Sequence, residues 1–445
     1  MKKTFRIGGV HPHDNKISAG AATEVFPAIE TAYVSMAQHL GAPATPIVAV
    51  GDKVKVGQVI AEPAGFISGY VHSPVSGTVK SVAPRADIAG NMVPHVEITV
   101  EGDDWMEDID RSEAIVKDIP FTPEEIIDKV KKAGVVGLGG ASFPTHVKLA
   151  PPKDKKAECL ILNGTECEPY LTSDDRIMRE RPTEILIGAA IMMKSLGVTR
   201  GYVGIEENKP EAIATMSAAA AEFTQIEVVT LKKRYPQGGE KQLIDAIIRR
   251  QVPSGALPID TGAVVQNVGT SLAVYEAVQK NKPLIDNVIT VTGQCLPVQH
   301  NYKVRIGTPM SKILAVAGGL PEDAAKVISG GPMMGRAIAN LDAATVKANG
   351  AILVLTEAQT RRRPESACIR CSKCASACPM GLEPWLLNKL SRAGGMHAEL
   401  EKERVYDCIE CGCCSFTCPA GIPLLDMIRS SKAEVMKIMR SRPKK

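Results

Sequence analysis

Twelve cysteines carry the clearest chemical signal in this sequence, because nine of them lie between residues 368 and 418. Within that stretch the spacing Cys-x2-Cys-x2-Cys-x3-Cys-Pro occurs twice. Three thiolates at such spacing wrap one iron–sulfur cluster, and the fourth cysteine, which precedes proline, reaches the other cluster of the pair. The two copies of the motif consist of Cys368, Cys371, Cys374 and Cys378, and of Cys408, Cys411, Cys414 and Cys418.

The spacing therefore predicts two 4Fe–4S clusters that exchange their fourth ligands. We expect one cluster on Cys368, Cys371, Cys374 and Cys418, and the other on Cys408, Cys411, Cys414 and Cys378. Zinc is the alternative, but zinc sites use two separated Cys-x2-Cys pairs rather than a triple run followed by Cys-Pro. Cys413 lies outside the register and is expected to be a free or buried thiol. Such clusters pass single electrons, so each end of this relay needs a partner.

A glycine-rich segment in the middle of the chain is typical of phosphate binding. Gly137, Gly139 and Gly140 lead through Phe143 to Lys148. Backbone N–H groups of such a turn, placed before a helix, hold a phosphate group, and a lysine adds positive charge. The segment does not complete the dinucleotide-binding fingerprint. A tight turn that only packs two elements together is the alternative.

An acidic segment follows a predicted buried strand at residues 159–162. It runs from Asn163 through Glu166 to Glu168 and ends at Pro169. Ligands of α/β sheets bind at the carboxyl ends of the strands, so these carboxylates are placed to accept hydrogen bonds from ribose hydroxyls or a carboxamide. A solvated acidic loop is the alternative.

The overall composition restricts the class of protein. The chain has 445 residues, of which 44% are hydrophobic and 23% charged, as in folded proteins of about three or four domains. The net charge of +4 and the 4% of aromatic residues argue against a nucleic-acid partner. We see no secretory signal and no apolar run of the ~20 residues that a membrane span needs. We therefore expect a soluble chain in a reducing compartment, with at most a peripheral membrane role.

The elements that must position these residues fall into four regions. Short strands are predicted over residues 1–110, alternating helices and strands over 118–285, a small α+β unit over 286–357, and the helical cysteine region over 358–445. The chain is thus predicted to be an α/β multidomain protein. Its last stretch, residues 432–445, is basic, which predicts either a solvated tail or a contact with an anionic membrane surface or an acidic partner.

Several individual elements are also predicted. Thr122 and Glu125 form a capping box that starts a helix. Strands are expected over 47–50, 159–162, 201–205, 288–292 and 351–355, and helices over 185–196 and 310–317. Residues 360–364 are expected to link the third region to the cysteine region.

Residues 51–62 and 72–82 resemble the barrel-sandwich fold of biotinyl and lipoyl carriers. In those carriers a modified lysine lies at a hairpin tip between the two halves. The corresponding tip here, Gly65 to Gly69, contains no lysine, so a structural or docking role is expected.

Four segments resemble the flavin- and NADH-binding subunit of respiratory complex I. They are GLGGASFPTHVK (137–148), NGTECEP (163–169), YPQGGE (235–240) and VQNVGT (265–270). The third region resembles the β-grasp domain of that family. The resemblance implies that Phe143, Glu168 and Glu240 face the nicotinamide nucleotide. It also implies an FMN-binding set made of Gly137, Gly139, Gly140, Lys148, Asn163, Glu166, Gly238, Gly239, Glu240, Gln266 and Asn267.

The barrel-sandwich start and the paired cluster motifs make nearly the whole chain similar to the C subunits of Rnf complexes, which are membrane-bound NAD:ferredoxin oxidoreductases that move Na⁺ or H⁺. This resemblance implies FMN, NADH and two 4Fe–4S clusters as cofactors, and it implies no catalytic side chain. It implies membrane subunits and a ferredoxin-like subunit as partners, on the cytoplasmic side of the membrane. Two alternatives stay open: a soluble cobalamin reductase with the same modules, and a relay scaffold with a degenerate nucleotide site, because Leu138 and Gly239 depart from the complex I pattern.

Overall fold

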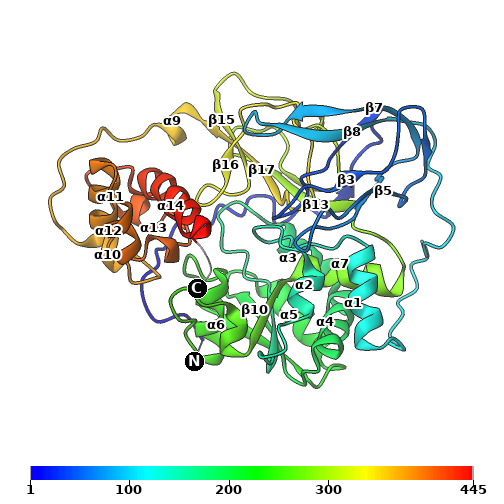
Figure 1. Ribbon diagram of the computed structural model, residues 1–445, viewed down its shortest axis with the longest axis horizontal. Helices are drawn as coiled ribbons and strands as arrows, with labels where there is room; N and C mark the ends of the chain where they lie inside the picture. The colour runs from blue at the N-terminus through cyan, green and yellow to red at the C-terminus, as the bar shows by residue number, and fades with distance from the viewer. Residues whose placement is uncertain (1, 443–445) are drawn as a thin grey trace.

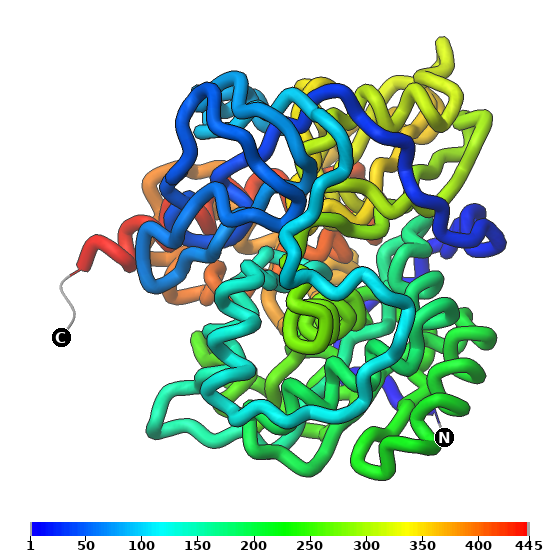
Figure 2. Tube along the Cα trace, turned by 90° about the vertical axis from the view of Figure 1, so that its right-hand side faces the viewer, coloured from blue at the N-terminus to red at the C-terminus, as the bar shows by residue number. Residues whose placement is uncertain are grey.

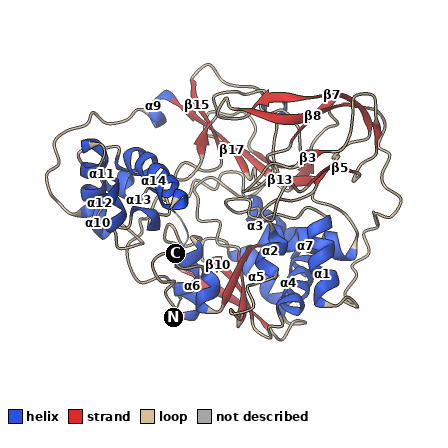
Figure 3. Cartoon of the chain, in the orientation of Figure 1, coloured by secondary structure: helices blue, strands red, loops and turns tan. Residues whose placement is uncertain are grey.

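The computed structural model describes residues 2–442 and arranges them in four units (Figure 1). An α/β unit occupies the lower half of the view, two β units lie above it, and a helical unit lies to the left. Figure 3 shows the helices concentrated in the α/β unit and in the C-terminal unit. Among the described residues, none of the helices has a stretch long and apolar enough to cross a membrane.

The first β unit is built from two small antiparallel sheets. One has the strand order β2 (Thr31–Ser35), β8 (Met92–Val100), β7 (Gly77–Ala86) and β4 (Lys53–Val54), and the other has β3 (Thr45–Pro46), β5 (Val59–Glu62) and β6 (Val71–His72). Apolar side chains such as Val34, Ile60 and Ile98 fill the space between them. The tip that corresponds to the carrier lysine lies between β5 and β6.

The strand predicted over residues 47–50 is wrong. β3 ends at Pro46, and only Ile47 continues the pairing, with its N–H donating to Ile60 O at 2.9 Å. The chain then turns, as Asp52 N–H bonds to Ala49 O, and leaves Val50 exposed. Apolar residues before a Gly-Asp turn suggest a buried strand, but the exposed fraction of a side chain cannot be read from its type.

The central unit contains a parallel sheet with the order β11 (Ile226–Leu231), β10 (Gly201–Glu206), β9 (Cys159–Asn163) and β12 (Ala263–Asn267). Alternate residues of β9 face opposite sides, since Leu160 and Leu162 pack with the larger helical layer while Ile161 packs with α6 (Glu240–Ile248). The larger layer includes α1 (Pro123–Lys132), α4 (Pro182–Leu196), α5 (Pro210–Ala220) and α7 (Val268–Gln279). The capping box predicted at Thr122 and Glu125 is confirmed at the start of α1.

The second β unit is a mixed sheet packed on α8 (Met310–Val316). Its strand order is β1 (Thr23–Val25), β14 (His300–Arg305), β13 (Asp286–Thr292), β17 (Ala351–Thr356), β15 (Ala324–Ser329) and β16 (Arg336–Ala337). β1 pairs in parallel with β14, so residues 23–25 belong to this sheet and not to the barrel-sandwich unit that follows them in the chain.

The C-terminal unit is helical and is reached through residues 361–372, which form no helix or strand. Its helices are α10 (Lys373–Ser376), α11 (Pro384–Ala393), α12 (His397–Lys402), α13 (Cys413–Thr417) and α14 (Leu424–Ser441). The predicted solvated tail from residue 432 is only partly correct. The segment is not irregular, because α14 continues to Ser441 with Val435 buried and Lys432 bonded to Cys408 O at 2.8 Å, whereas Lys437 and Arg440 are exposed. Residues 443–445 lie outside the described range.

An N-terminal arm, residues 2–22, ties these units together. It pairs with the α/β unit at Lys3 and Val10, and its Gly9 N–H donates to Ala377 O of the C-terminal unit at 2.9 Å. Figure 2 follows the dark blue arm from the α/β unit up to the β units. The arm therefore reaches three units before the first complete sheet begins.

Candidate functional site

Two asparagines meet at the carboxyl edge of the parallel sheet. β9 and β12 are paired so that Asn163 lies opposite Asn267, the last residue of each strand. Asn163 Nδ2 donates to Gly238 O at 2.9 Å, and Asn267 Nδ2 donates to Asp174 Oδ2 at 2.8 Å. Asn267 Oδ1 also accepts the Gly269 N–H at 2.7 Å and caps α7. Both side chains are thus held in place by the fold at the edge where α/β sheets bind ligands.

The glycine-rich loop lies against this edge. Gly137 N–H donates to Phe143 O at 2.9 Å, which closes the loop and leaves Gly139 and Gly140 exposed at its tip. A Cβ on Gly139 would lie 2.9 Å from Asn267 Nδ2, whereas a Cβ on Gly140 would have no protein atom within 4 Å. The loop therefore approaches Asn267 as closely as a backbone can, and the space beside Gly140 is open.

Lys148 and Glu240 close the other side of the site. Lys148, on α2 (Thr145–Leu149), donates to Glu240 Oε1 at 2.7 Å and to Val265 O at 3.1 Å. Glu240 begins α6, directly after Gly238 and Gly239. A Cβ on Gly238 would lie only 2.4 Å from Thr165 Oγ1, so this backbone also makes a close approach.

The residues at this edge fit a bound FMN. Gln266 Nε2 is buried and finds no hydrogen-bond partner within residues 2–442, so an amide donor is left for a ligand. Gly139 and Gly140 are exposed at the loop tip, and the space beside Gly140 is open. Lys148 lies at the same edge, where it is paired with Glu240, and a cation at such a loop suits a flavin phosphate. Phe143 is partly exposed beside the loop tip.

The two glutamates of the 163–169 segment accept hydrogen bonds from backbone N–H groups of the chain. Glu166 accepts the N–H groups of Asp174 at 2.7 Å and Asp175 at 3.3 Å, at the start of α3 (Ser173–Glu180). Glu168 accepts the N–H groups of Met333 at 3.1 Å and Met334 at 2.7 Å, from the loop after β15. Burial raises the pKa of Glu168, and these N–H donors oppose the rise. The structure thus places Glu166 beneath the sheet edge and Glu168 toward the second β unit.

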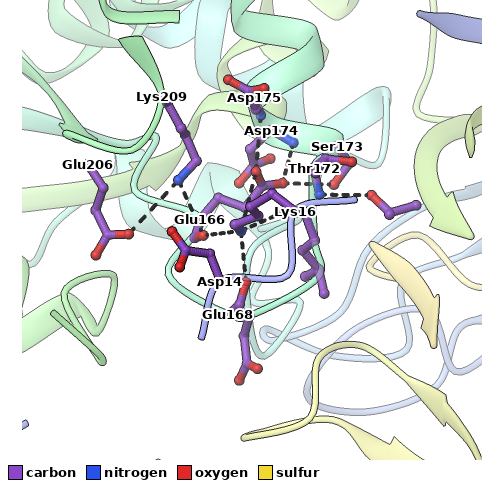
Figure 4. Close-up of polar contacts among 12 residues, drawn as sticks. Asp14, Lys16, Glu166, Glu168, Thr172, Ser173, Asp174, Asp175, Glu206 and Lys209 are labelled. Atoms are coloured by element: carbon purple, nitrogen blue, oxygen red, sulfur yellow. Dashed lines mark hydrogen bonds and ion pairs between the residues drawn. The ribbon is translucent and has the colours of Figure 1, made fainter. Parts of the chain in front are cut away.

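A cluster of buried charges lies under the edge and was not predicted from sequence. Two lysines and three carboxylates meet there (Figure 4): Lys16, Lys209, Glu206, Asp174 and Glu166. Burial, together with the neighbouring Glu166 carboxylate, raises the pKa of Asp174 to about 7. Burial, assisted by Lys209, lowers the pKa of Lys16 to about 8. Only Glu166 was marked by the sequence, as part of the acidic 163–169 segment; Lys16, Lys209, Glu206 and Asp174 carry no motif, because they meet Glu166 from separate parts of the chain.

The two cysteine motifs fold alike. In each, the residues two and four positions after the first cysteine have left-handed backbone conformations: Arg370 and Ser372 in the first motif, and Glu410 and Gly412 in the second. A short helix follows each, α10 and α13. This alternation of left-handed and right-handed residues turns N–H groups inward and forms a concave anion-binding loop, as iron–sulfur sites use.

The packing brings the last cysteine of the first motif next to the second motif. Cys378, from the first motif, lines one cavity together with Cys408, Cys411 and Cys414 of the second. Burial raises the pKa of Cys408 to about 11 and that of Cys414 to about 12, which marks an apolar, enclosed position. Among the described residues no three His, Cys, Asp or Glu side chains converge as on a single metal ion. Cys413 also lines this cavity, so five thiols surround it, and thiolates are the ligands of iron–sulfur clusters.

The other four cysteines lie nearer the surface. Cys374 and Cys418 are partly buried in the core of the C-terminal unit, while Cys368 and Cys371 are exposed. We call the two candidate sites the inner site (Cys378, Cys408, Cys411, Cys414) and the outer site (Cys368, Cys371, Cys374, Cys418).

Tyr235 connects the inner site with the sheet edge. Its hydroxyl donates to Cys411 O at 2.9 Å and lies 3.4 Å from Glu168 Oε1. It packs in one buried cluster with Val10, Cys411 and Cys413. Cys413 is therefore a buried thiol between the inner site and Tyr235. Three residues further along, Gly238 contacts Asn163 and Thr165 at the sheet edge.

Family models match four parts of the chain in the order of its units. They are described as the RnfC barrel sandwich hybrid domain (residues 3–104), the Nuo51 FMN-binding domain (130–276), the SLBB domain (288–337) and the 4Fe-4S dicluster domain (365–422). Together they define an iron–sulfur flavoprotein.

Curated relatives specify the class further. The chain is 44% identical over 394 residues (88% of this chain, 85% of the relative) to the C subunit of the proton-translocating ferredoxin:NAD(+) oxidoreductase complex from Clostridium ljungdahlii. It is 42% identical over 434 residues (97% of each) to the Na(+)-translocating counterpart from Acetobacterium woodii. Among solved structures, an NAD+-reducing NiFe-hydrogenase in the H2-reduced state matches with a TM-score of 0.49 and 18% identity, covering 72% of this chain and 67% of that chain. The chain belongs to the family of C subunits of ion-translocating ferredoxin:NAD⁺ oxidoreductase complexes.

The family confirms the resemblance predicted from sequence and the fold class of four modules. It also favours the electron-input hypothesis over a cobalamin reductase, because the relatives are subunits of oxidoreductase complexes. FMN, NAD(H) and 4Fe–4S clusters are the cofactors of such a chain.

Proposed function

We propose that the chain exchanges electron pairs with NADH at the β9–β12 edge and delivers them singly, through the inner site and then the outer site, to partner subunits at the membrane. FMN, when bound, supplies the step between hydride and single electrons, and the two clusters carry one electron at a time. The reaction is reversible, and a ferredoxin is the distant partner.

The observation that carries this proposal is the position of residues 235–239. One end of this segment contacts Asn163 through Gly238 O, and the other contacts Cys411 through the Tyr235 hydroxyl. The inner site is therefore adjacent to the flavin site, whereas Cys368 and Cys371 of the outer site are exposed. The order of electron transfer thus runs opposite to the order of the motifs in the sequence.

The chain's own residues bind and orient the cofactors in this proposal, and no side chain acts as an acid or base. Phe143, Glu168 and Glu240 are proposed toward the nicotinamide nucleotide. The proposed FMN contacts are Gly137, Gly139, Gly140, Lys148, Asn163, Glu166, Gly238, Gly239, Glu240, Gln266 and Asn267. The cluster ligands are the eight cysteines of the inner and outer sites. The proposed location is peripheral, on the cytoplasmic side of the membrane.

Two cysteine variants test the order of the sites. Cys371→Ser should remove the outer cluster and leave NADH-dependent reduction of the inner cluster intact, as counted by EPR after NADH addition. Cys411→Ser should remove the inner cluster and stop NADH from reducing the outer one. Equal NADH-dependent reduction of the remaining cluster in both variants would contradict the order. If the reconstituted wild-type chain binds no flavin and shows no bleaching with NADH, the proposed function itself fails.

A further inference from the structure

The N-terminal arm inserts one lysine into the α/β unit beneath the flavin site. Lys16 Nζ donates to three backbone carbonyls, those of Glu166 at 2.8 Å, Glu168 at 2.8 Å and Leu171 at 2.6 Å. An ammonium group has three donors, so all are used. Only 14% of the side chain is exposed. Figure 4 shows Lys16 pointing into the loop from a different element.

These three carbonyls belong to the segment that begins at the flavin edge. The segment follows β9 and carries Thr165, whose hydroxyl donates to Asn163 Oδ1 at 2.7 Å. Lys209 holds the same segment from the other side, donating to Thr165 O at 2.6 Å. Buried carbonyls without donors are costly, so the segment keeps its shape because two lysines bind it.

The arm is fixed so that Lys16 cannot simply withdraw. Asp14 O accepts the Tyr170 N–H at 2.8 Å, and the Asp14 carboxylate accepts Asn208 Nδ2 at 3.0 Å. Lys233 also pairs with this carboxylate. The anchor two residues before Lys16 thus binds both the loop and the ends of β10 and β11.

Lys16 also decides the charge beneath the flavin site. Four buried or nearly buried carboxylates lie there, on Glu166, Asp174, Asp175 and Glu206, against the ammonium groups of Lys16 and Lys209 and the Arg179 guanidinium, which pairs with Asp175. Asp174 is one hydrogen bond from Asn267, so the charge is felt at the edge itself. Removing Lys16 takes away one of these three positive charges. A more negative surrounding disfavours the electron-rich reduced flavin more than the oxidised one.

We propose that Lys16 is a positioning residue of the flavin site, which shapes the 164–171 segment and offsets the buried carboxylates so that reduced flavin is stabilised. The inference rests on the proposed function. It adds a residue from the N-terminal arm, outside the residues 130–276 that match the FMN-binding family model. The flavin site of this chain is then completed by a part of the sequence distant from that domain.

Three variants separate shape from charge in the full-length, cluster-reconstituted chain. Lys16→Met removes the donors and the charge, Lys16→Gln keeps a donor without the charge, and Lys16→Arg keeps the charge. Lys2→Met is the matched control, since Lys2 lies on the same arm and makes an exposed pair with Glu207. Fluorescence titration measures the affinity for oxidised FMN, and spectroelectrochemistry measures the flavin potential.

Lys16→Met should weaken binding of reduced FMN about tenfold more than that of oxidised FMN, which lowers a two-electron potential by about 30 mV. Lys16→Gln should lower the potential similarly with a smaller loss of affinity for oxidised FMN. Lys16→Arg should keep the potential, and Lys2→Met should match the wild type. The inference is overturned if Lys16→Met and Lys16→Gln both retain the wild-type potential, whatever their affinity. If the wild type binds no FMN, it is the proposed function that has failed; should Lys16→Met not fold, Lys16→Gln and Lys16→Arg still decide the matter.

Discussion

Gly139→Ala tests how closely the glycine loop must approach Asn267. The new Cβ would lie 2.9 Å from Asn267 Nδ2, 3.0 Å from its Cβ and 3.1 Å from its Cγ. Asn267 cannot retreat, because its amide bonds both Asp174 and Gly269. The exposed tip of the loop must therefore shift away from Asn267 while no ligand is bound.

Binding must then bring the loop back, so the strain appears in the flavin affinity. Overpacking of this kind costs about 1–3 kcal/mol. That corresponds to an FMN Kd raised about 5- to 150-fold, since each 1.4 kcal/mol is a factor of ten. The melting temperature of the flavin-free chain should stay close to that of the wild type, because Gly139 is exposed at the loop tip.

Fluorescence titration with FMN measures this affinity, and Gly20→Ala is the matched control. Gly20 has no protein atom within 4 Å of a built Cβ and no left-handed backbone, and it lies in the N-terminal arm. The FMN Kd of the Gly20→Ala variant should stay within about twofold of that of the wild type. A wild-type Kd for Gly139→Ala would refute the argument that loop and Asn267 act together. If Gly139→Ala instead destabilises the flavin-free chain by the same ~1–3 kcal/mol, the loop cannot move away from Asn267.

Three further outcomes follow from the structure. Gly140→Ala should leave the flavin-free melting temperature unchanged yet weaken FMN binding, because its methyl group would enter the open space beside the loop; unchanged affinity would place the flavin elsewhere. Lowering the pH from 7 to 5 should cost about 2 kcal/mol of unfolding free energy through His72, because burial lowers its pKa in the folded chain from 6.5 to about 3, so over this range only the unfolded chain takes up the proton. This contribution is present above pH 6.5 and is lost as the pH falls. Thermal melts at the two pH values measure it, and His72→Gln should show a correspondingly smaller loss of stability. Tyr235→Phe should leave the FMN affinity unchanged but speed up hydrogen exchange at the Gly9 and Val10 amides, because the buried Cys411 carbonyl loses its hydrogen-bond donor at a cost of about 1–3 kcal/mol. Unchanged protection of these two amides would show that the Tyr235 hydroxyl does not hold the C-terminal unit against the α/β unit.

The cysteine motifs and the sheet edge illustrate what a single sequence can predict. The thiols of each motif lie three or four residues apart, and the glycine loop and the end of β9 are also local patterns. Short spacings constrain the backbone directly, so the local turns and helices follow from residue type. The capping box at Thr122 was also predictable, because it depends only on residues close together in the chain. The strand predicted at residues 47–50 was wrong, because the exposure of these side chains depends on distant parts of the chain.

The position of the buried lysine and the proposed order of the two cluster sites follow only from the tertiary structure. Lys16 meets Glu166 across 150 positions of the chain, and Tyr235 meets Cys411 across 176. Nothing in either residue's neighbours marks such a contact, because it arises from how four separately patterned units pack. The spacing of the motifs therefore predicts which atoms hold each cofactor, whereas the packing of the arm and the C-terminal unit sets the positions of the proposed sites relative to one another.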